Sequence, residues 1–158
     1  MKILAIDIGM TMGWAYRDPT TFTSGIWKFE MAAKDTSHKG NRYVTLWRHL
    51  ESFKAVRGMP THVVYERPGN LFGHARKVLP AMQGIIELWA LLNKAALLDY
   101  LASEVKKHAC KGTANKDEMI KAAAIRWPDL KFKTHDQCDA VWLLSYMISK
   151  LDRDDLNF

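Results

Sequence analysis

The sequence predicts an α/β fold built on a five-stranded mixed sheet that is flanked by helices. Three short apolar segments joined by tight turns occupy residues 2–29, a pattern typical of an antiparallel meander. After them, stretches with apolar residues at helical spacing alternate with two further short apolar segments. This helix-strand-helix-strand order predicts that the fourth and fifth strands are parallel and are reached by crossover connections. The 158 residues match the usual size of one domain. We expect residues 1–151 to form this domain and 152–158 to be an acidic, frayed tail.

The three strands of the meander are predicted over residues 2–8, 14–16 and 22–29. Ile3 to Ile6 are consecutive apolar residues, as in a strand that is buried on both faces. Met10 to Gly13 should turn the chain, and Asp18-Pro19 should end the second strand.

A helix and the fourth strand follow a polar stretch at 34–41 that is predicted to be a loop. The apolar face of this helix consists of residues at helical spacing: Tyr43, Leu46, Trp47, Leu50 and Phe53. Gly58 to Pro60 should end the helix. His62 to Glu66 should form the fourth strand, parallel to the first strand and beside it.

A long helix that is apolar on almost every side is predicted over residues 79–93. One face should pack on the sheet. The second apolar face has two open interpretations, which are contact with a helix of a second subunit and a central position in the core. Pro80 should either lie in the first turn or kink the helix, and the sequence leaves both open.

The remaining predicted elements are a strand over 95–100 and helices over 103–108, 115–127 and 135–151. Asn115 and Glu118 have the spacing of a capping box, which places a helix start at Asn115. Pro128 should end that helix.

The composition indicates an intracellular protein that binds a polyanion. The net charge is +6 although the last seven residues carry three Asp and one Arg, and a basic body most often binds nucleic acid. No apolar run is long enough to span a membrane and no secretory signal is evident, so we expect a cytoplasmic location and no membrane partner. The acidic tail has two open roles, as a contact for a basic protein partner and as a disordered end.

Two cysteines are too few to predict a disulfide framework in an intracellular chain. Cys110 and Cys138, together with His108 and His135, do supply four ligands of the type that zinc binds. Their spacing matches no familiar zinc finger, so a structural zinc site is disfavoured.

Two carboxylates follow strands that should be neighbours in the sheet. Asp7 comes directly after the four apolar residues of the first strand, near its end, and Glu66 ends the fourth strand. Because the carboxyl ends of parallel strands meet at one edge of a sheet, these side chains should lie side by side where sites form in open α/β sheets. An ionised Asp at the end of a buried strand costs free energy unless something compensates it. The alternative role for Asp7 is to cap the following turn.

Asp136 and Asp139 are three residues apart at the start of the last predicted helix, so both carboxylates share one face. They could simply be solvated acids that favour a helix N-terminus. If this helix packs across the sheet edge beside Asp7 and Glu66, four carboxylates would repel one another and need divalent metal. Hard oxygen ligands suit Mg²⁺ or Mn²⁺, and two such ions can drive hydrolysis of a phosphodiester.

Three motifs occur in the order found in a known family: Ile-Asp-Ile-Gly at 6–9, Val-Tyr-Glu at 64–66 and His-Asp-Gln-Cys-Asp-Ala at 135–140. In these motifs, and over Ile3 to about Ser149, the chain resembles the RuvC group of Holliday junction resolvases, which have a ribonuclease H-like fold. The resemblance implies that Asp7, Glu66, Asp136 and Asp139 are catalytic and bind two Mg²⁺ ions, for which Mn²⁺ substitutes.

The same resemblance implies a homodimer formed through the helix at 79–93. Two active sites would then nick two strands of a four-way DNA junction symmetrically, leaving 5′-phosphate and 3′-hydroxyl ends, in recombination and repair.

Two lysines also match the family. Lys116 lies in the first turn of a capped helix, where a cation has little structural reason to be and where phosphate binds readily, so a catalytic phosphate contact is predicted. Lys106 is either a phosphate contact or a solvated helix residue. Further predicted DNA contacts are Lys111, Arg67, Arg76 and Lys77.

The chain departs from the family after the fourth strand. The family has an aromatic wedge directly after the fourth-strand Glu, whereas here Phe72 is a displaced candidate. It could unstack a base at a branch point, or it could belong to the core.

Four other functions share features with this sequence. A nuclease acting on flaps and forks has the same chemistry. A ribonuclease H places its catalytic Glu on the first helix, where Glu51 is the only acid. Asp7 to Thr11 resembles the first phosphate loop of sugar kinases and actin-like ATPases, but the chain is too short for that duplicated fold. A junction-binding protein without catalysis is the fourth.

Overall fold

The structure is a computed structural model that describes residues 1–29, 41–69, 73 and 75–154, the side chains of 152–154 excepted. Its strands are β1 (Ile3–Asp7), β2 (Met12–Arg17), β3 (Phe22–Trp27), β4 (His62–Glu66) and β5 (Ala96–Tyr100). Its helices are α1 (Asn41–Arg57), α2 (Ala75–Leu92), α3 (Ala102–Ala109), α4 (Lys116–Arg126) and α5 (His135–Asp154). None of the helices in these ranges combines the length and the apolar character needed to cross a membrane.

The strands form one mixed sheet in the order β3-β2-β1-β4-β5. β1, β2 and β3 pair antiparallel as a meander, while β4 lies parallel to β1 and β5 lies parallel to β4. This confirms the predicted fold class, including the parallel pairing of the fourth and fifth strands.

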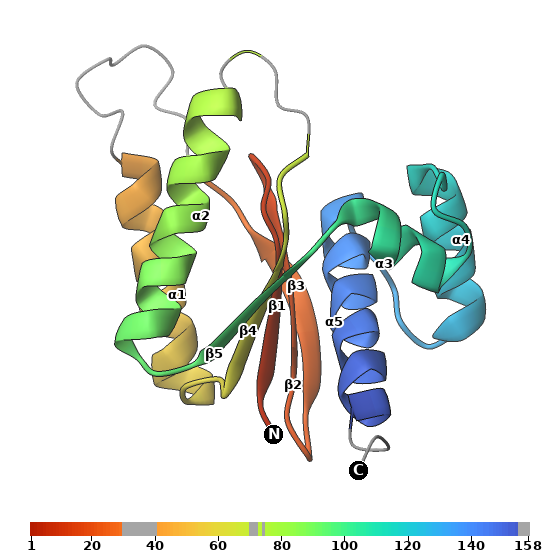
Figure 1. Ribbon diagram of the computed structural model, residues 1–158, viewed down its shortest axis with the longest axis horizontal. Coiled ribbons are helices and arrows are strands. Elements are labelled where there is room, and N and C mark those ends of the chain that lie inside the picture. The colour runs from red at the N-terminus through yellow and green to blue at the C-terminus, as the bar shows by residue number, and fades with distance from the viewer. Residues whose placement is uncertain (30–40, 70–72, 74, 155–158) are drawn as a thin grey trace.

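Helices cover both faces of the sheet (Figure 1). α1 and α2 lie against one face, and α5 lies against the other with α3 and α4 outside it. Because side chains alternate along a strand, β1 serves both layers. Leu4 and Ile6 pack under α1 and α2, whereas Ile3 and Ala5 pack under α5.

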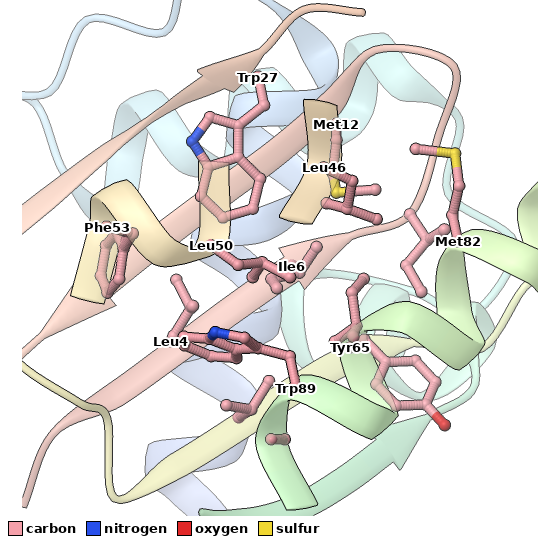
Figure 2. Close-up of a cluster of buried hydrophobic side chains, with 14 of the residues drawn as sticks. Leu4, Ile6, Met12, Trp27, Leu46, Leu50, Phe53, Tyr65, Met82 and Trp89 are labelled. Carbon is pink, nitrogen blue, oxygen red and sulfur yellow. The ribbon is translucent and has the colours of Figure 1, made fainter. Parts of the chain in front are cut away.

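The core under α1 and α2 contains most of the large buried side chains (Figure 2). Trp89 and Met82 of α2 and Leu46 and Leu50 of α1 are fully buried there against the sheet. Apolar area removed from water is the main stabilising term in folding, at about 25 cal/mol per Å². This layer therefore holds the sheet rigid at the point where β1 and β4 run side by side.

The turn predicted at residues 10–13 is partly wrong, because β2 already begins at Met12. Met12 is fully buried and pairs with Trp27, and Gly13 pairs with Ile26 and with Asp7. Gly13 is paired with strands on both sides and Met12 with β3 on one side, which keeps both residues extended. Local turn propensity did not reveal this pairing.

α2 and α5 each extend at least three residues beyond one of their predicted ends. α2 begins at Ala75, so Pro80 lies inside the helix rather than in its first turn. α5 continues to Asp154, beyond the predicted end at 151, since no Gly or Pro interrupts that stretch. The predicted loop at 34–41 lies outside the described residues except for Asn41, which begins α1.

Candidate active site

The carboxylates of Asp7 and Glu66 lie on the face of the sheet that α5 covers. On β1, Ile3 and Ala5 belong to the core under α5, and Asp7 follows at the same two-residue spacing. On β4, Val64 belongs to that core and Glu66 follows it. The two strands are parallel neighbours, so both acids reach the same end of the sheet.

The start of α5 crosses the sheet beside Asp7. In the β1–β2 pairing, Gly13 lies opposite Asp7. A Cβ atom added to Gly13 would stand only 1.8 Å from the carbonyl oxygen of Asp136. The first turn of α5 therefore rests on the strand backbone, and it brings Asp136 and Asp139 to the end of β1.

The pKa values show that the carboxylates are within electrostatic reach of one another. Burial raises the pKa of Asp7 well above its usual value, and the charges of Glu66, Asp139 and Asp136 raise it further. Burial and then the charge of Asp139 raise the pKa of Glu66 to about 7. Burial, together with the charge of Asp136, also raises the pKa of Asp139.

The two lysines singled out from the sequence stand beside these acids. Lys116 lowers the pKa of Asp7 and of Asp139, and Lys106 lowers the pKa of Glu66 and of Asp139. Lys116 is exposed in the first turn of α4. The predicted capping box stabilises that turn. The backbone N–H of Glu118 donates to Oδ1 of Asn115 at 2.9 Å, and the backbone N–H of Asn115 donates to Oε2 of Glu118 at 2.8 Å.

The other predicted DNA contacts are more scattered. Arg67 forms an ion pair with Asp99, and Lys111 forms one with Glu118 at 2.6 Å. Arg76 and Lys77 are exposed in the first turn of α2. Phe72 lies outside the described residues. A role in DNA binding stays a prediction for all of these residues.

The donor set fits a hard divalent cation. Across the described parts of the chain, no three Asp, Glu, His or Cys side chains lie close enough together to hold a metal ion as they stand. Ionised carboxylates without a cation repel one another, and the pKa shifts above record that repulsion together with burial. Oxygen ligands of this kind are those that Mg²⁺ and Mn²⁺ take, so Asp7, Glu66, Asp136 and Asp139 are the residues that would bind them.

Metal-free protein is expected to lose stability as the pH rises from about 4.5 to about 7. The pKa of Glu66 rises on folding from 4.5 to about 7, so in this range the folded state keeps a proton that the unfolded state releases. Stability is then highest below the unfolded pKa and falls until the folded pKa is passed, by on the order of 3 kcal/mol for this group. The pKa values of Asp7 and Asp139 are raised as well, which adds in the same direction.

Urea unfolding in EDTA at several pH values between about 5 and 8 measures this slope. The variant Glu66→Gln should flatten it, because its side chain does not titrate. Stability that increases with pH over this range would show that these carboxyls are not held as described.

Sequence reasoning assigned no role at this site to three residues that the structure places in this region. Gly13 was assigned to a turn, although a glycine inside a strand often marks the close approach of another backbone. Gln137 is a buried polar residue that joins α5 to β3 through Ser24. His135 lowers the pKa of Asp139, and its Nδ1 atom is buried with no hydrogen-bond partner in the described chain.

Glu51 lies on the opposite side of the sheet from the carboxylates. Its Oε1 accepts a hydrogen bond from Nε1 of the fully buried Trp89 at 2.7 Å. Replacement by Ala should therefore leave a buried donor unpaired and lower the free energy of unfolding by about 1–3 kcal/mol. Urea unfolding measures this loss. Glu51→Gln keeps the acceptor and should restore most of the stability, whereas a ribonuclease H-type catalytic Glu would lose activity in both variants.

Neither a protein-family model nor a curated protein sequence matches the chain. Among solved structures, the chain is similar to RuvC of Thermus thermophilus, with a TM-score of 0.66 and 16% identity over 95% of this chain and 96% of that chain. It is also similar to T. thermophilus RuvC in complex with Holliday junction substrate, with a TM-score of 0.71 and 16% identity over 96% of this chain and 94% of that chain. The chain therefore has a RuvC-like fold, as the sequence motifs predicted.

Proposed function

We propose that this chain, with its RuvC-like fold, is a divalent-metal-dependent DNA endonuclease that cuts four-way junctions as a homodimer. The observation that supports the proposal is that the charges of Glu66, Asp139 and Asp136 act on the buried Asp7, so that acids from the start, middle and end of the chain influence one another electrostatically. Such a cluster has little structural value, because burial and mutual repulsion destabilise it unless a cation is bound. The similarity to a RuvC solved with a Holliday junction supports branched DNA as the substrate.

In this proposal Asp7, Glu66, Asp136 and Asp139 hold two Mg²⁺ ions, with Mn²⁺ as a substitute. When bound, the ions supply an activated water and neutralise the leaving oxygen of a phosphodiester. The chain itself contributes rigid placement, since Asp7 and Glu66 are fixed by neighbouring strands. Lys116 and Lys106 would bind the phosphate that is cut and compensate the charge of the acids beside them.

The basic residues around this edge supply the DNA surface in the proposal. Lys111 extends it from the segment between α3 and α4, and Arg76 and Lys77 extend it from the start of α2, the next element after β4. Their contacts would be to phosphates, which give affinity and position but not sequence selection.

The outer face of α2 supports the homodimer. Met82, Ile86 and Trp89 are fully buried on the inner face of this helix. On the outer face Leu88, Leu91 and Leu92 are 52%, 63% and 65% exposed. An apolar row of this kind on a helix is typical of a contact with another subunit.

Purified protein incubated with Mg²⁺ tests the proposal on five labelled substrates: a four-way junction, a flap, a fork, a linear duplex and an RNA–DNA hybrid. We expect paired, symmetric nicks in the junction with 5′-phosphate ends. Equal cutting of flaps and forks would instead indicate a general branched-DNA nuclease, and preferred cutting of the hybrid would indicate a ribonuclease H. Binding of the junction without any cutting would contradict the nuclease.

A further inference from the structure

The carboxylate cluster has two halves that reach the site on different elements. Asp7 and Glu66 belong to adjacent strands of one sheet, and their relative position is fixed by the β1–β4 pairing. Asp136 and Asp139 belong to α5, which is a separate element packed on the sheet. The spacing between the two halves therefore depends on where the first turn of α5 rests.

The first determinant of that spacing is Gly13. It lies opposite Asp7 in the sheet, and a Cβ atom there would stand 1.8 Å from the carbonyl oxygen, 2.3 Å from the carbonyl carbon of Asp136 and 3.0 Å from the amide nitrogen of Gln137. All three atoms belong to the backbone of a helix, so no side-chain rotation can make room for a methyl group. Any other residue at position 13 would lift the start of α5 from the sheet.

The second determinant is the side chain of Gln137, a buried polar residue in the first turns of α5. Its Nε2 donates to the Ser24 hydroxyl of β3 at 3.0 Å, and its Oε1 accepts from the Lys133 amide at 2.9 Å. The Gln137 amide donates to the Thr134 hydroxyl at 3.1 Å. The same side chain thus ties the helix start to the edge of the meander and to the segment that precedes the helix.

We infer that Gly13 and the Gln137–Ser24 hydrogen bond are positioning elements that set the distance between the sheet half and the helix half of the metal-binding cluster. The inference rests on the proposed function. Gly13 sets how closely α5 approaches, and Ser24 sets where the helix start lies along the sheet. Neither residue touches the substrate or a metal ion. They act through Asp136 and Asp139, as groups behind a ligand orient it.

The primary readout is the affinity for Mn²⁺, measured by calorimetry on the full chain without DNA. Ser24→Ala should weaken binding about 10-fold, the size typical for loss of a group that orients a ligand. Ser24→Thr keeps the hydroxyl and should restore the affinity. Gly13→Ala should weaken binding by at least about 100-fold, because it moves two ligands together. Gly112→Ala is the matched control, since a methyl group there meets only the Ser103 carbonyl oxygen, at 3.6 Å.

Thermal unfolding in EDTA separates positioning from folding. The Ser24→Ala and Ser24→Thr variants should unfold at temperatures within a few degrees of each other, although their Mn²⁺ affinities differ. If the Gly13→Ala protein does not fold, the comparison of these two Ser24 variants decides the test. In cutting assays the Ser24→Ala variant should need more Mg²⁺ for half-maximal rate, while its rate at saturating Mg²⁺ changes less.

The outcomes distinguish the two proposals. Wild-type protein that binds no Mn²⁺ and cuts no DNA would refute the metal-dependent nuclease itself. Wild-type protein that binds Mn²⁺, together with a Ser24→Ala variant of equal affinity, would refute the positioning role and leave the nuclease standing.

Discussion

Replacement of Asp7 by Asn is expected to reduce junction cutting by at least about 1,000-fold, since in the proposed mechanism the loss of a carboxylate that would hold metal removes several kcal/mol of transition-state stabilisation. Junction binding should stay within about twofold in Ca²⁺ or EDTA, because in the proposal the affinity comes from phosphate contacts of the basic residues. Asn preserves the shape of the side chain and removes only its charge. Gel-based cutting and binding assays with the same labelled junction measure both quantities.

The metal-free Asp7→Asn protein should also unfold at a higher temperature than the wild type at neutral pH. Burial and three neighbouring carboxylates disfavour the charged form of Asp7, so removal of this charge relieves repulsion. Added Mn²⁺ should raise the unfolding temperature of the wild type, and it should raise that of the variant much less. Asp129→Asn changes an exposed acid after α4 and is the matched control. Undiminished cutting by the Asp7 variant would remove this residue from the mechanism.

Replacement of Leu88 and Leu91 by Glu should convert the proposed dimer into a monomer. Both side chains are more than half exposed in the isolated chain, so the fold of the monomer should tolerate the change. Burial of a leucine in an interface stabilises it by about 1.5–3 kcal/mol, and two buried charges would oppose association further. We expect the dimer dissociation constant to rise by more than about 100-fold.

Light scattering coupled to size-exclusion chromatography measures this change. Ile125→Glu is the matched control, because Ile125 is 84% exposed on α4, away from α2. The monomeric variant should still bind metal but should no longer nick two strands of a junction together. A wild-type protein that is monomeric at all concentrations would contradict the proposed assembly through α2.

The sheet and the β1–β4 half of the site were predictable because local pattern determines them. Four consecutive apolar residues predicted the buried strand β1, and the strand-helix-strand order predicted parallel pairing with β4. Once these two strands are neighbours, Asp7 and Glu66 must meet at their carboxyl ends. The capping box at Asn115 was likewise predictable, because its two partners are close in sequence.

The position of α5 was not predictable in this way. The sequence indicated that Asp136 and Asp139 share one helical face, but not where that face lies. The answer depends on contacts between residues more than 100 positions apart, such as Gln137 with Ser24. Gly13 was assigned to a turn for the same reason, since only the packing of α5 and the flanking strands shows why it must be small and extended. Glu51 also needed the structure, because its partner Trp89 comes from another helix.

The alternation of side chains along β1 has a consequence for how such a protein can change over time. Each substitution in a central strand affects only one of the two layers. Residues such as Leu4 and Ile6 can be exchanged for others of similar volume, as long as α1 and α2 still fit. The layer beneath α5 has less freedom, because small residues at positions 5 and 15 and glycine at 13 hold a helix at close range. Sequence drift should therefore accumulate on one side of the sheet and leave the other nearly unaltered.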